Sequence, residues 1–501
     1  MFRKILIANR GEIAVRIIRA CRELDITTVA VYSEVDRDSL HVQVADEAVC
    51  IGPAPAQDSY LAMDRIIETA KKTGAEAVHP GYGFLAENPE FARLCEDSGI
   101  VFIGPVSRSM ELVGDKIRAR QTMEKAGIPI IPGMKGVHEN IADYANEAKK
   151  IGYPVMIKAS AGGGGKGMRI AYNADELKPG LEAGKREAKG AFNNDSVYLE
   201  KYIEEPRHVE VQILADNFGN TVHLFERECS IQRRHQKIIE ESPSVALDPD
   251  LRSLMGETAL NVVKAAGYNN AGTVEFLLDK NRNFYFLEVN ARLQVEHPVT
   301  ELVTGIDLVH QQLHVAAGEK LALKQSDLKQ KGHAIECRIY AEDPDNQFLP
   351  SSGRVLYLKE PHGPGVRHDC GIFSGCEVPI YYDPILAKLI VWAGDRDMAI
   401  CRMREALNDY VILGIKTTLD FLKDVFAHPK FKNGSTTTAF ISRYFDDWSE
   451  RPGSEENRRI VAVAAAYDSL QNVYIRTGKH EEQELETSPW LTLGKWRMGR
   501  G

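Results

Sequence analysis

The chain has 501 residues, of which 44% are hydrophobic and 27% charged, and its formal net charge is −9. This length exceeds one simple core and predicts two to four domains, while the composition is that of an ordinary globular protein. A net negative charge argues against non-specific binding to nucleic acid or to an anionic membrane, so any anion site has to be built locally.

The eight cysteines are scattered, with no C-x-x-C pair and no zinc-type spacing, which is typical of reduced thiols in a cytoplasm. The apolar run near the N-terminus, residues 5–8, is far too short for the core of a signal peptide. No run reaches the roughly 18 apolar residues that a membrane span requires. We therefore expect a soluble, cytoplasmic protein.

A β-α-β unit opens the chain. The pattern predicts an apolar strand at residues 4–8, an amphipathic helix at 12–24 and a second apolar strand at 27–32. Only Gly11 stands in the first turn, so the dinucleotide fingerprint with three glycines is absent. We favour a Rossmann-like scaffold that does not bind NAD.

A loop broken by Gly and Pro follows the strand predicted at residues 75–78. Open α/β sheets place ligands at the carboxyl ends of their parallel strands. The grouping of polar and aromatic side chains favours a site loop over a plain turn. These side chains are His79, Tyr82, Glu87 and Asn88.

Four consecutive glycines, residues 162–165, lie between strands predicted at 155–158 and 168–171. Glycine lets backbone N–H groups approach an anion closely, and Lys166 adds a positive charge. The segment is not a Walker A loop, because Gly167 stands where Ser or Thr would bind Mg²⁺. A flexible linker is the alternative, but the position between two strands favours a mobile flap over phosphates.

A basic cluster lies at residues 227–237 of this acidic protein. Its cations are Arg227, Arg233, Arg234, His235 and Lys237. Both a solvated face and an anion site fit this pattern.

A β-hairpin is predicted from strands at 274–279 and 284–288 around the turn at 280–283. A symmetric register would place Glu275 directly across from Glu288, although a shift by one residue would separate them. Like charges that face each other are destabilising unless a cation lies between them. Glu275, Glu288 and Asn290 are therefore predicted to form an oxygen-ligand site for Mg²⁺.

Polar and apolar residues alternate strictly from 287 to 296. In an extended chain the polar side chains would share one face. Two carboxylates, an amide, an Arg and a Gln suit a site for metal and anion together better than a solvated strand face. The five residues are Glu288, Asn290, Arg292, Gln294 and Glu296.

The C-terminal third begins with loose alternation at residues 334–342, which presents Glu336 and Arg338 on one face. Strands with Gly and Pro turns are predicted over 353–391, and helices over 396–445.

The tail begins with a linker-like stretch at residues 451–456. Beyond it lie an apolar helix candidate at 460–470 and two tryptophans, Trp490 and Trp496. Such tryptophans fit either docking of a partner or packing against the tail's own domain.

Three segments together resemble the biotin carboxylases of the ATP-grasp superfamily: residues 79–88, 158–168 and 288–297. The likeness covers roughly residues 1–447, and the first and third segments in combination are specific. It implies an α/β and α+β ATP-grasp fold. Its expected parts are a Rossmann-like N-terminal domain at 1–113, a linker and mobile glycine-rich lid at 114–203, a body with a C-terminal mixed β-sheet domain at 204–447, and a tail at 448–501 that docks a partner.

The resemblance also implies an activity, the ATP-dependent carboxylation of biotin with bicarbonate through carboxyphosphate. This is the first half-reaction of a biotin-dependent carboxylase. Mg²⁺ or Mn²⁺ would bind at Glu275 and Glu288, with Asn290 nearby. The residues implied for the substrate ATP are Lys116, Lys158, Gly163, Gly164, Gly165, Lys166, Gly167, Glu200, Lys201, Ile203, His208, Gln232 and His235.

The implied bicarbonate site consists of Lys237, Arg292 and the backbone of Gln294 and Val295. A planar guanidinium and N–H donors suit a small planar anion. Glu296 would be the base, and nearby carboxylates and cations would shift its pKa in opposite directions. Biotin would meet Tyr82 and Arg338, with Arg338 stabilising the enolate-like oxygen. The implied catalytic residues are Glu296, Arg338, Arg292 and Lys237.

An Ala-Met-Lys-Met biotin-attachment segment is absent from the sequence. We therefore expect a biotinylated carrier protein and a carboxyltransferase subunit on other chains, and a homodimer, with no nucleic-acid or membrane partner. Two alternatives compete. One is another ATP-grasp enzyme, a carboxylate-amine ligase or a purine-pathway carboxylase, and the other is a non-catalytic nucleotide-binding regulatory subunit.

Overall fold

The N-terminal part is built on a parallel sheet of five strands in the order β3-β2-β1-β4-β5. The computed structural model describes residues 1–134, 140–159, 168–192, 195–449 and 463. The predicted β-α-β unit is present as β1, α1 and β2. The elements are β1 Lys4–Ile7, α1 Gly11–Glu23, β2 Thr27–Ser33, α2 Leu40–Val44, β3 Glu47–Gly52, α3 Met63–Thr73, β4 Ala77–His79, α4 Pro89–Asp97, β5 Val101–Phe102 and α5 Ser107–Gly114.

Helix α6 and then a small antiparallel sheet, in the order β7-β6-β8, with helices α7 and α8 packed against it, follow. These elements have a hydrophobic core of their own, which includes Tyr144, Ile157 and Leu199. The elements are α6 Lys116–Lys125, α7 Ile141–Ile151, β6 Val155–Ala159, β7 Arg169–Ala171, α8 Ala174–Phe192 and β8 Val197–Lys201. The predicted glycine flap, Gly163 to Gly167 included, lies outside the described residues.

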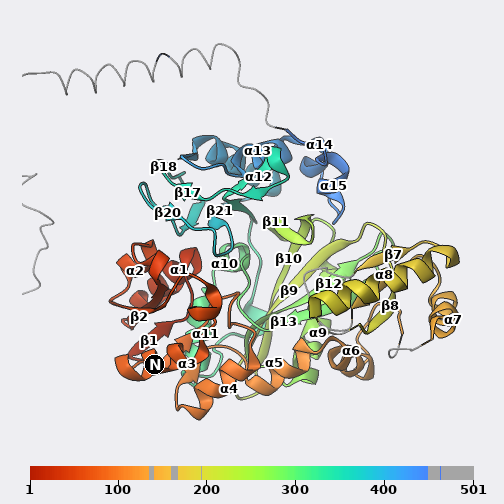
Figure 1. The fold of residues 1–501 in the computed structure, drawn as a ribbon, viewed down its shortest axis with the longest axis horizontal. Helices are drawn as coiled ribbons and strands as arrows, with labels where there is room; N and C mark the ends of the chain where they lie inside the picture. Colours follow the sequence, from red (N-terminus) through yellow and green to blue (C-terminus); the bar gives the residue numbers. More distant parts are fainter. Residues whose placement is uncertain (135–139, 160–167, 193–194, 450–462, 464–501) are drawn as a thin grey trace, which may run out of the picture. The chain divides into compact units, whose positions relative to one another are not determined.

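An eight-stranded sheet forms the centre of the molecule, in the order β13-β12-β9-β10-β11-β14-β21-β19. Its first strands, coloured green and yellow-green in Figure 1, come from one continuous stretch of chain, and β21 and β19 join from the C-terminal part. The elements of this stretch are β9 Arg207–Ala215, β10 Thr221–Arg233, β11 Gln236–Ser242, α9 Pro249–Ala266, β12 Asn270–Leu278, β13 Phe284–Asn290, α10 His297–Thr304, α11 Leu308–Ala316 and β14 His333–Tyr340.

The C-terminal part extends this sheet and covers it with helices (Figure 1). Leu389, Met403 and Phe426 belong to its core. The elements are β15 Glu342–Asp343, β16 Leu349–Pro350, β17 Gly353–Arg354, β18 Tyr357–Lys359, β19 Val366–Cys370, β20 Glu377–Val378, β21 Ile385–Ala393, α12 Arg396–Asp409, β22 Val411–Leu413, α13 Leu419–Ala427, α14 Pro429–Lys432 and α15 Phe440–Tyr444. The α/β start and α+β remainder confirm the predicted fold class.

The chain divides into two compact units, residues 1–448 and 449–501. The four-part division predicted from the sequence remains a prediction. The tail linker and the two tail tryptophans lie outside the described residues, and of the helix expected at 460–470 only Val463 is described.

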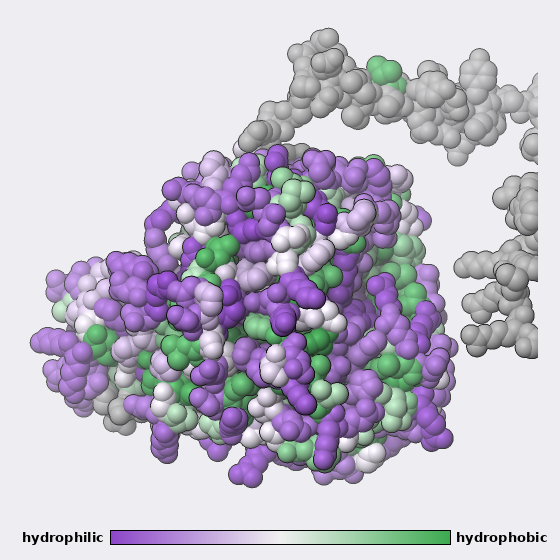
Figure 2. All heavy atoms as spheres, turned by 180° about the vertical axis from the view of Figure 1, so that it is seen from behind, coloured by the Kyte–Doolittle hydropathy of each residue, from purple (hydrophilic) through white to green (hydrophobic). Residues whose placement is uncertain are grey.

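The state of the cysteines and the distribution of hydrophobic residues on the surface agree with what the composition predicts. All eight cysteines are free. On the face shown in Figure 2, hydrophobic residues lie scattered among hydrophilic ones. In the described part of the chain, no helix combines the length and apolarity needed to cross a membrane.

The N-terminal and C-terminal parts meet where Gly371 touches the start of helix α1. A methyl group added to Gly371 would lie 2.6 Å from the backbone nitrogen of Glu12. Neither atom belongs to a flexible side chain, so the two segments would have to move apart. This close approach holds α1 against β19 and β21, next to the site described below.

We expect Gly371→Ala to lower the free energy of unfolding by about 1–3 kcal/mol, because overpacking displaces backbone. Urea denaturation followed by circular dichroism measures this. Gly394→Ala is the matched control, since the added methyl group there meets no atom within 4 Å. Equal effects of the two substitutions would contradict the prediction.

A pH-sensitive ion-pair cluster joins β11, β14 and α12. His333 Nε2 lies 2.8 Å and Arg396 Nε 2.6 Å from Glu241. Burial alone would raise the pKa of Glu241, but these two partners outweigh it and lower the pKa to about 2 from 4.5. The stabilisation is therefore complete above the unfolded pKa of 4.5 and is lost as the pH falls toward 2.

Lowering the pH from 5 to about 3 should therefore reduce the free energy of unfolding of the wild type by on the order of 2–3 kcal/mol at most. The Glu241→Gln variant should not show this loss. Urea denaturation at several pH values compares the two slopes. The exposed Glu377→Gln serves as control and should keep the wild-type slope. Parallel slopes for wild type and Glu241→Gln would refute this assignment.

Candidate active site

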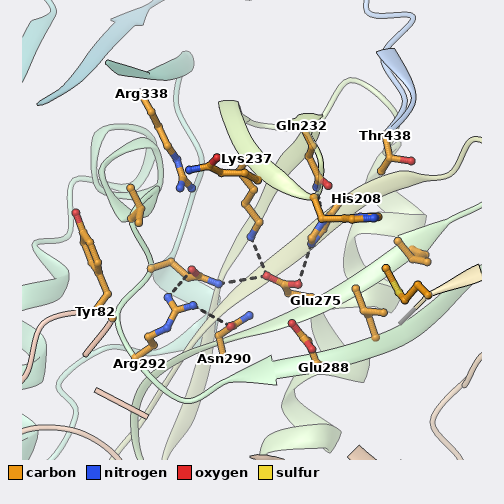
Figure 3. Close-up of a pocket in the computed structure, with 18 of the residues that line it drawn as sticks. Tyr82, His208, Gln232, Lys237, Glu275, Glu288, Asn290, Arg292, Arg338 and Thr438 are labelled. Atoms are coloured by element: carbon orange, nitrogen blue, oxygen red, sulfur yellow. Dashed lines mark hydrogen bonds and ion pairs between the residues drawn. The ribbon is translucent and has the colours of Figure 1, made fainter. Parts of the chain in front are cut away.

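A cleft of about 810 Å³ gathers nearly all of the site residues predicted from the sequence. Figure 3 shows Tyr82 and Arg338 toward one side of it and His208, Gln232 and Thr438 toward the other. The predicted residues that line it are Tyr82, Lys116, Lys158, Glu200, Lys201, Ile203, His208, Gln232, His235, Lys237, Glu275, Glu288, Asn290, Arg292, Gln294, Val295 and Arg338. Glu296 lies just behind them, in contact with Lys237 and Arg338.

The carboxylate pair of the hairpin has the predicted register. Glu275 on β12 faces Glu288 on β13, and the register shifts by one residue immediately afterwards, toward the turn. The bulge therefore ends the symmetric pairing but leaves the two carboxylates opposite each other. Burial, together with the charge of Glu275, raises the pKa of Glu288.

The predicted extended face from 288 to 296 is only partly correct. Strand β13 ends at Asn290, and Glu296 precedes the first residue of helix α10. Beyond Asn290 the chain turns, because the residues that follow bond to side chains rather than to a neighbouring strand. Arg292 nevertheless folds back onto this strand end, donating to Asn290 Oδ1 at 3.1 Å and to Gln294 Oε1 at 2.7 Å.

Lys237 is the cation at the centre of the site. Its ammonium group bonds to Glu275 and Glu296, at 2.7 Å each, and also to Glu210. Burial alone would lower the pKa of Lys237, but the three carboxylates raise it well above its usual value. Lys237 is therefore charged and holds three buried acids around one point.

Glu296 is ionised in this environment. Burial alone would raise its pKa, but Lys237 and Arg338 outweigh burial and hold the pKa well below the ordinary value. The sequence left open whether the nearby carboxylates or the nearby cations have the larger effect on the pKa of Glu296. In the structure the cations have the larger effect.

Arg338 lies between two carboxylates. It donates to Glu240 Oε1 at 2.6 Å and to Glu296 Oε2 at 3.0 Å. Burial raises the pKa of Glu240 to about 7, although Arg338 opposes this effect. The guanidinium is thereby oriented from behind, at the wall of the cleft.

The end of the cleft predicted to bind ATP contains the expected polar residues, and several of them bond to one another. Lys158 and Arg120 both form ion pairs with Glu200. Lys201 donates to the carbonyl oxygens of Gly152 and Tyr153. Further along, His208 Nδ1 lies 2.7 Å from the amide of Gln232, and Lys116 Nζ lies 3.7 Å from Glu288.

The loop after β4 contributes to the site through two of its four noted residues. Tyr82 lines the cleft, and Glu87 accepts from Arg292 Nε at 3.0 Å and from the N–H of Ala291 at 2.9 Å. His79 and Asn88 instead shape the loop: His79 is fully buried and accepts from Gly81, and Asn88 caps helix α4.

The basic cluster at 227–237 separates into different roles. Arg227 is fully buried and bonds to Glu210, Gln212, Thr273 and Thr300, so it belongs to the interior. Arg233 forms an ion pair with Glu342 at 2.6 Å. Only His235 and Lys237 of the five cations line the cleft.

Two acids at the site were missed by the sequence analysis, Glu210 and Glu240. Alternation along β9, with His208, Glu210 and Gln212 on one face, was the available signal for the first. Alternation along β11 and β14 also places Glu240 on the same face as Arg338. This neighbourhood becomes visible only once β11 is known to pair with β14.

The oxygen donors at the hairpin fit a divalent cation. Two facing carboxylates and an amide oxygen are the ligand types that Mg²⁺ selects, and Mn²⁺ accepts the same set. Burial and the charge of Glu275 raise the pKa of Glu288, and a bound cation would oppose both effects. Glu275, Glu288 and Asn290 could therefore hold such an ion.

Comparison with known proteins covers almost the whole described chain. Models for the biotin carboxylase N-terminal domain, the ATP-binding domain of carbamoyl-phosphate synthase L chain and the biotin carboxylase C-terminal domain match residues 1–110, 115–324 and 336–443. Biotin carboxylase 1 of Bacillus subtilis is 55% identical over 445 residues, which are 89% of this chain and 99% of that protein.

Longer relatives match as well. Methylcrotonoyl-CoA carboxylase subunit alpha of Mus musculus is 52% identical over 89% of this chain, which spans 62% of that protein. Among solved structures, the biotin carboxylase domain dimer of the 2-oxoglutarate carboxylase of Hydrogenobacter thermophilus, in complex with MgADP, ADP and bicarbonate, superimposes with a TM-score of 0.86. It is 48% identical and covers 90% of this chain and 100% of that chain. The chain therefore belongs to the biotin carboxylase family and has its ATP-grasp fold.

Proposed function

We propose that the Lys237–Glu296–Arg338 cluster, beside the Glu275–Glu288 pair, carries out the ATP-dependent carboxylation of biotin with bicarbonate. The observation that carries this proposal is the shared carboxylate: Glu296 contacts both Lys237 and Arg338. One acid thus touches the residues assigned to bicarbonate and to biotin. Biotin carboxylation is favoured over another ATP-grasp ligase or a regulatory subunit by the family match.

ATP is proposed to bind along the end of the cleft lined by Lys158, Glu200, Lys201, Ile203, His208, Gln232 and His235, with Lys116 near the phosphates. Lys158 forms an ion pair with Glu200, and its ammonium group has further N–H donors that could bind phosphate. Mg²⁺ or Mn²⁺ bound at Glu275, Glu288 and Asn290 would neutralise phosphate charge. The flap residues Gly163, Gly164, Gly165, Lys166 and Gly167 remain proposed phosphate contacts.

Bicarbonate is proposed to lie against Arg292, Lys237 and the backbone of Gln294 and Val295. Arg292 is presently bonded to Glu87, Asn290 and Gln294, which fix its planar group toward the cleft. Glu296, being ionised, is able to accept the proton of bicarbonate and so make the anion a nucleophile toward the γ-phosphate. Attack on the γ-phosphate breaks its bond to ADP, which leaves, and the product is carboxyphosphate, which releases CO₂ and phosphate.

Biotin is proposed to lie between Tyr82 and Arg338. Phosphate takes the ureido proton, and the guanidinium of Arg338 stabilises the negative oxygen that develops. Glu240 and Glu296 hold that guanidinium from two sides, so it needs little reorganisation during the reaction.

The partners follow from the activity. We propose that the biotin is carried by a separate protein and that a carboxyltransferase subunit uses the product, and that residues 448–501 dock a partner subunit. A homodimer is supported by the dimer described for the Hydrogenobacter relative. A cytoplasmic location is proposed because all eight cysteines are free thiols.

Glu296→Ala should abolish bicarbonate-dependent ADP release, with a loss of at least about 100-fold, because the variant lacks the proposed acceptor of the bicarbonate proton. The assay is ADP release with Mg²⁺-ATP, bicarbonate and free biotin, and ATP binding is measured separately by calorimetry. Glu319→Gln, a change at an exposed acid away from the cleft, is the control. Retained turnover in Glu296→Ala, with ATP bound normally, would refute the assigned role.

Arg338→Met should reduce the biotin-stimulated part of ADP release by about 100-fold or more, far beyond its effect on the bicarbonate-dependent background. The reason is that Arg338 acts on the charge that develops on biotin. Arg233→Met, which removes a neighbouring ion pair with Glu342, is the matched control and should keep biotin stimulation. Equal losses with and without biotin would assign Arg338 to bicarbonate activation instead.

A further inference from the structure

One buried cation near the site has no role in the proposal above. Lys388, on β21, is 0% exposed. Its register partners are Arg338 on β14 and Asp369 on β19. Two cations directly across from each other destabilise a sheet unless anions separate them. The positive charge of Lys388 therefore requires anionic or hydrogen-bond-accepting groups nearby.

The groups that balance the charge of Lys388 come from three different segments of the chain. Lys388 Nζ lies 3.3 Å from Glu12 Oε2 on helix α1 and 3.8 Å from Asp369 Oδ2. Nζ also donates a hydrogen bond to the backbone carbonyl oxygen of Val295, at 3.0 Å. The lysine thus joins the N-terminal helix and the C-terminal sheet to the turn that precedes Glu296.

A second buried side chain holds the preceding peptide unit. His297 is 0% exposed, and its Nδ1 lies 2.8 Å from the carbonyl oxygen of Gln294. Burial and nearby cations lower the pKa of His297 well below its usual value, so the ring is neutral. A neutral ring can make this contact only with its proton on Nδ1, as the donor.

The two contacts have a geometric consequence for the N–H groups. Neither peptide bond of this turn is cis, and in a trans peptide the C=O and N–H point in opposite directions. Holding the carbonyl of Gln294 therefore aims the N–H of Val295, and holding the carbonyl of Val295 aims the N–H of Glu296. Val295 lines the cleft, whereas the contact of His297 with Gln294 is buried and that of Lys388 with Val295 is partly buried.

We propose that Lys388 and His297 are positioning residues that fix the two peptide units of residues 294–296, so that backbone N–H groups and the Glu296 carboxylate face bicarbonate. This inference rests on the proposed bicarbonate site. Neither residue touches the reacting atoms, and both act through the backbone.

The test replaces each donor and measures KM for bicarbonate and for ATP in the ADP-release assay. Lys388→Met keeps the aliphatic stem but leaves Glu12 unpaired, so it is combined with Glu12→Gln. We expect KM for bicarbonate to rise about tenfold, the equivalent of one lost hydrogen bond from a charged donor. KM for ATP should stay within about twofold, since nucleotide contacts are unchanged.

The histidine supplies a matched pair of variants. His297→Asn places an amide N–H near the position of Nδ1 and should keep KM for bicarbonate near the wild-type value. His297→Leu lacks the donor and should raise it about tenfold. Arg396→Met is the control for lost stability. It removes a cation that pairs with Glu241, and this cation lies away from the turn.

The outcomes separate this inference from the proposed function. A wild type without bicarbonate-dependent turnover would refute the function itself. Normal wild-type turnover, with bicarbonate KM unchanged in both the Lys388→Met/Glu12→Gln and His297→Leu variants, would overturn only the positioning role. Loss of cooperative thermal unfolding in all of these variants, or an equal KM change in Arg396→Met, would assign the residues to stability and likewise overturn it.

Discussion

The site depends on one ammonium group, that of Lys237, which is shared by three buried carboxylates. Glu210, Glu275 and Glu296 come from three different strands or turns and would repel one another without it. A buried ion pair is costly unless further hydrogen bonds satisfy its members. Here Arg227 takes the other oxygen of Glu210, and Arg338 takes the other oxygen of Glu296. The active-site geometry is therefore a charge network in which each acid has two cationic or hydrogen-bonding partners.

The same principle explains how the separate parts of the chain are joined. The last three strands at one end of the eight-stranded sheet, β14, β21 and β19, carry a row of charged side chains, Arg338, Lys388 and Asp369. Helix α1 adds Glu12 to this row from the N-terminal part. Burial of charge thus requires all of these segments to be in place at once. The turn at 294–296 lies at their junction and is held in place by them.

Much of the fold and the site could be read from periodicity and local chemistry. The β-α-β start, the hairpin and the pairing of Glu275 with Glu288 follow from alternation of residue types and from turn composition, which are local properties. The prediction from the local pattern failed beyond Asn290. The alternation of polar and apolar residues continues to Glu296, whereas strand β13 ends at Asn290. Hydrogen bonds from Ala291 and Arg292 to the side chains of Glu87, Gln294 and Asn290 replace the strand pairing there. Those partners are distant in the sequence or depend on a turn.

By itself, the sequence determined the residue types of the site, the order of its main elements and, through three segments, the family. Only the tertiary structure decided which charges meet. The ionised state of Glu296, the interior role of Arg227 and the contacts of Glu210, Glu240 and Lys388 all depend on register between strands that are far apart in the chain. The physical reason is that electrostatic energy in a buried site is set by distances of a few ångströms, and composition or spacing along the chain does not specify such distances.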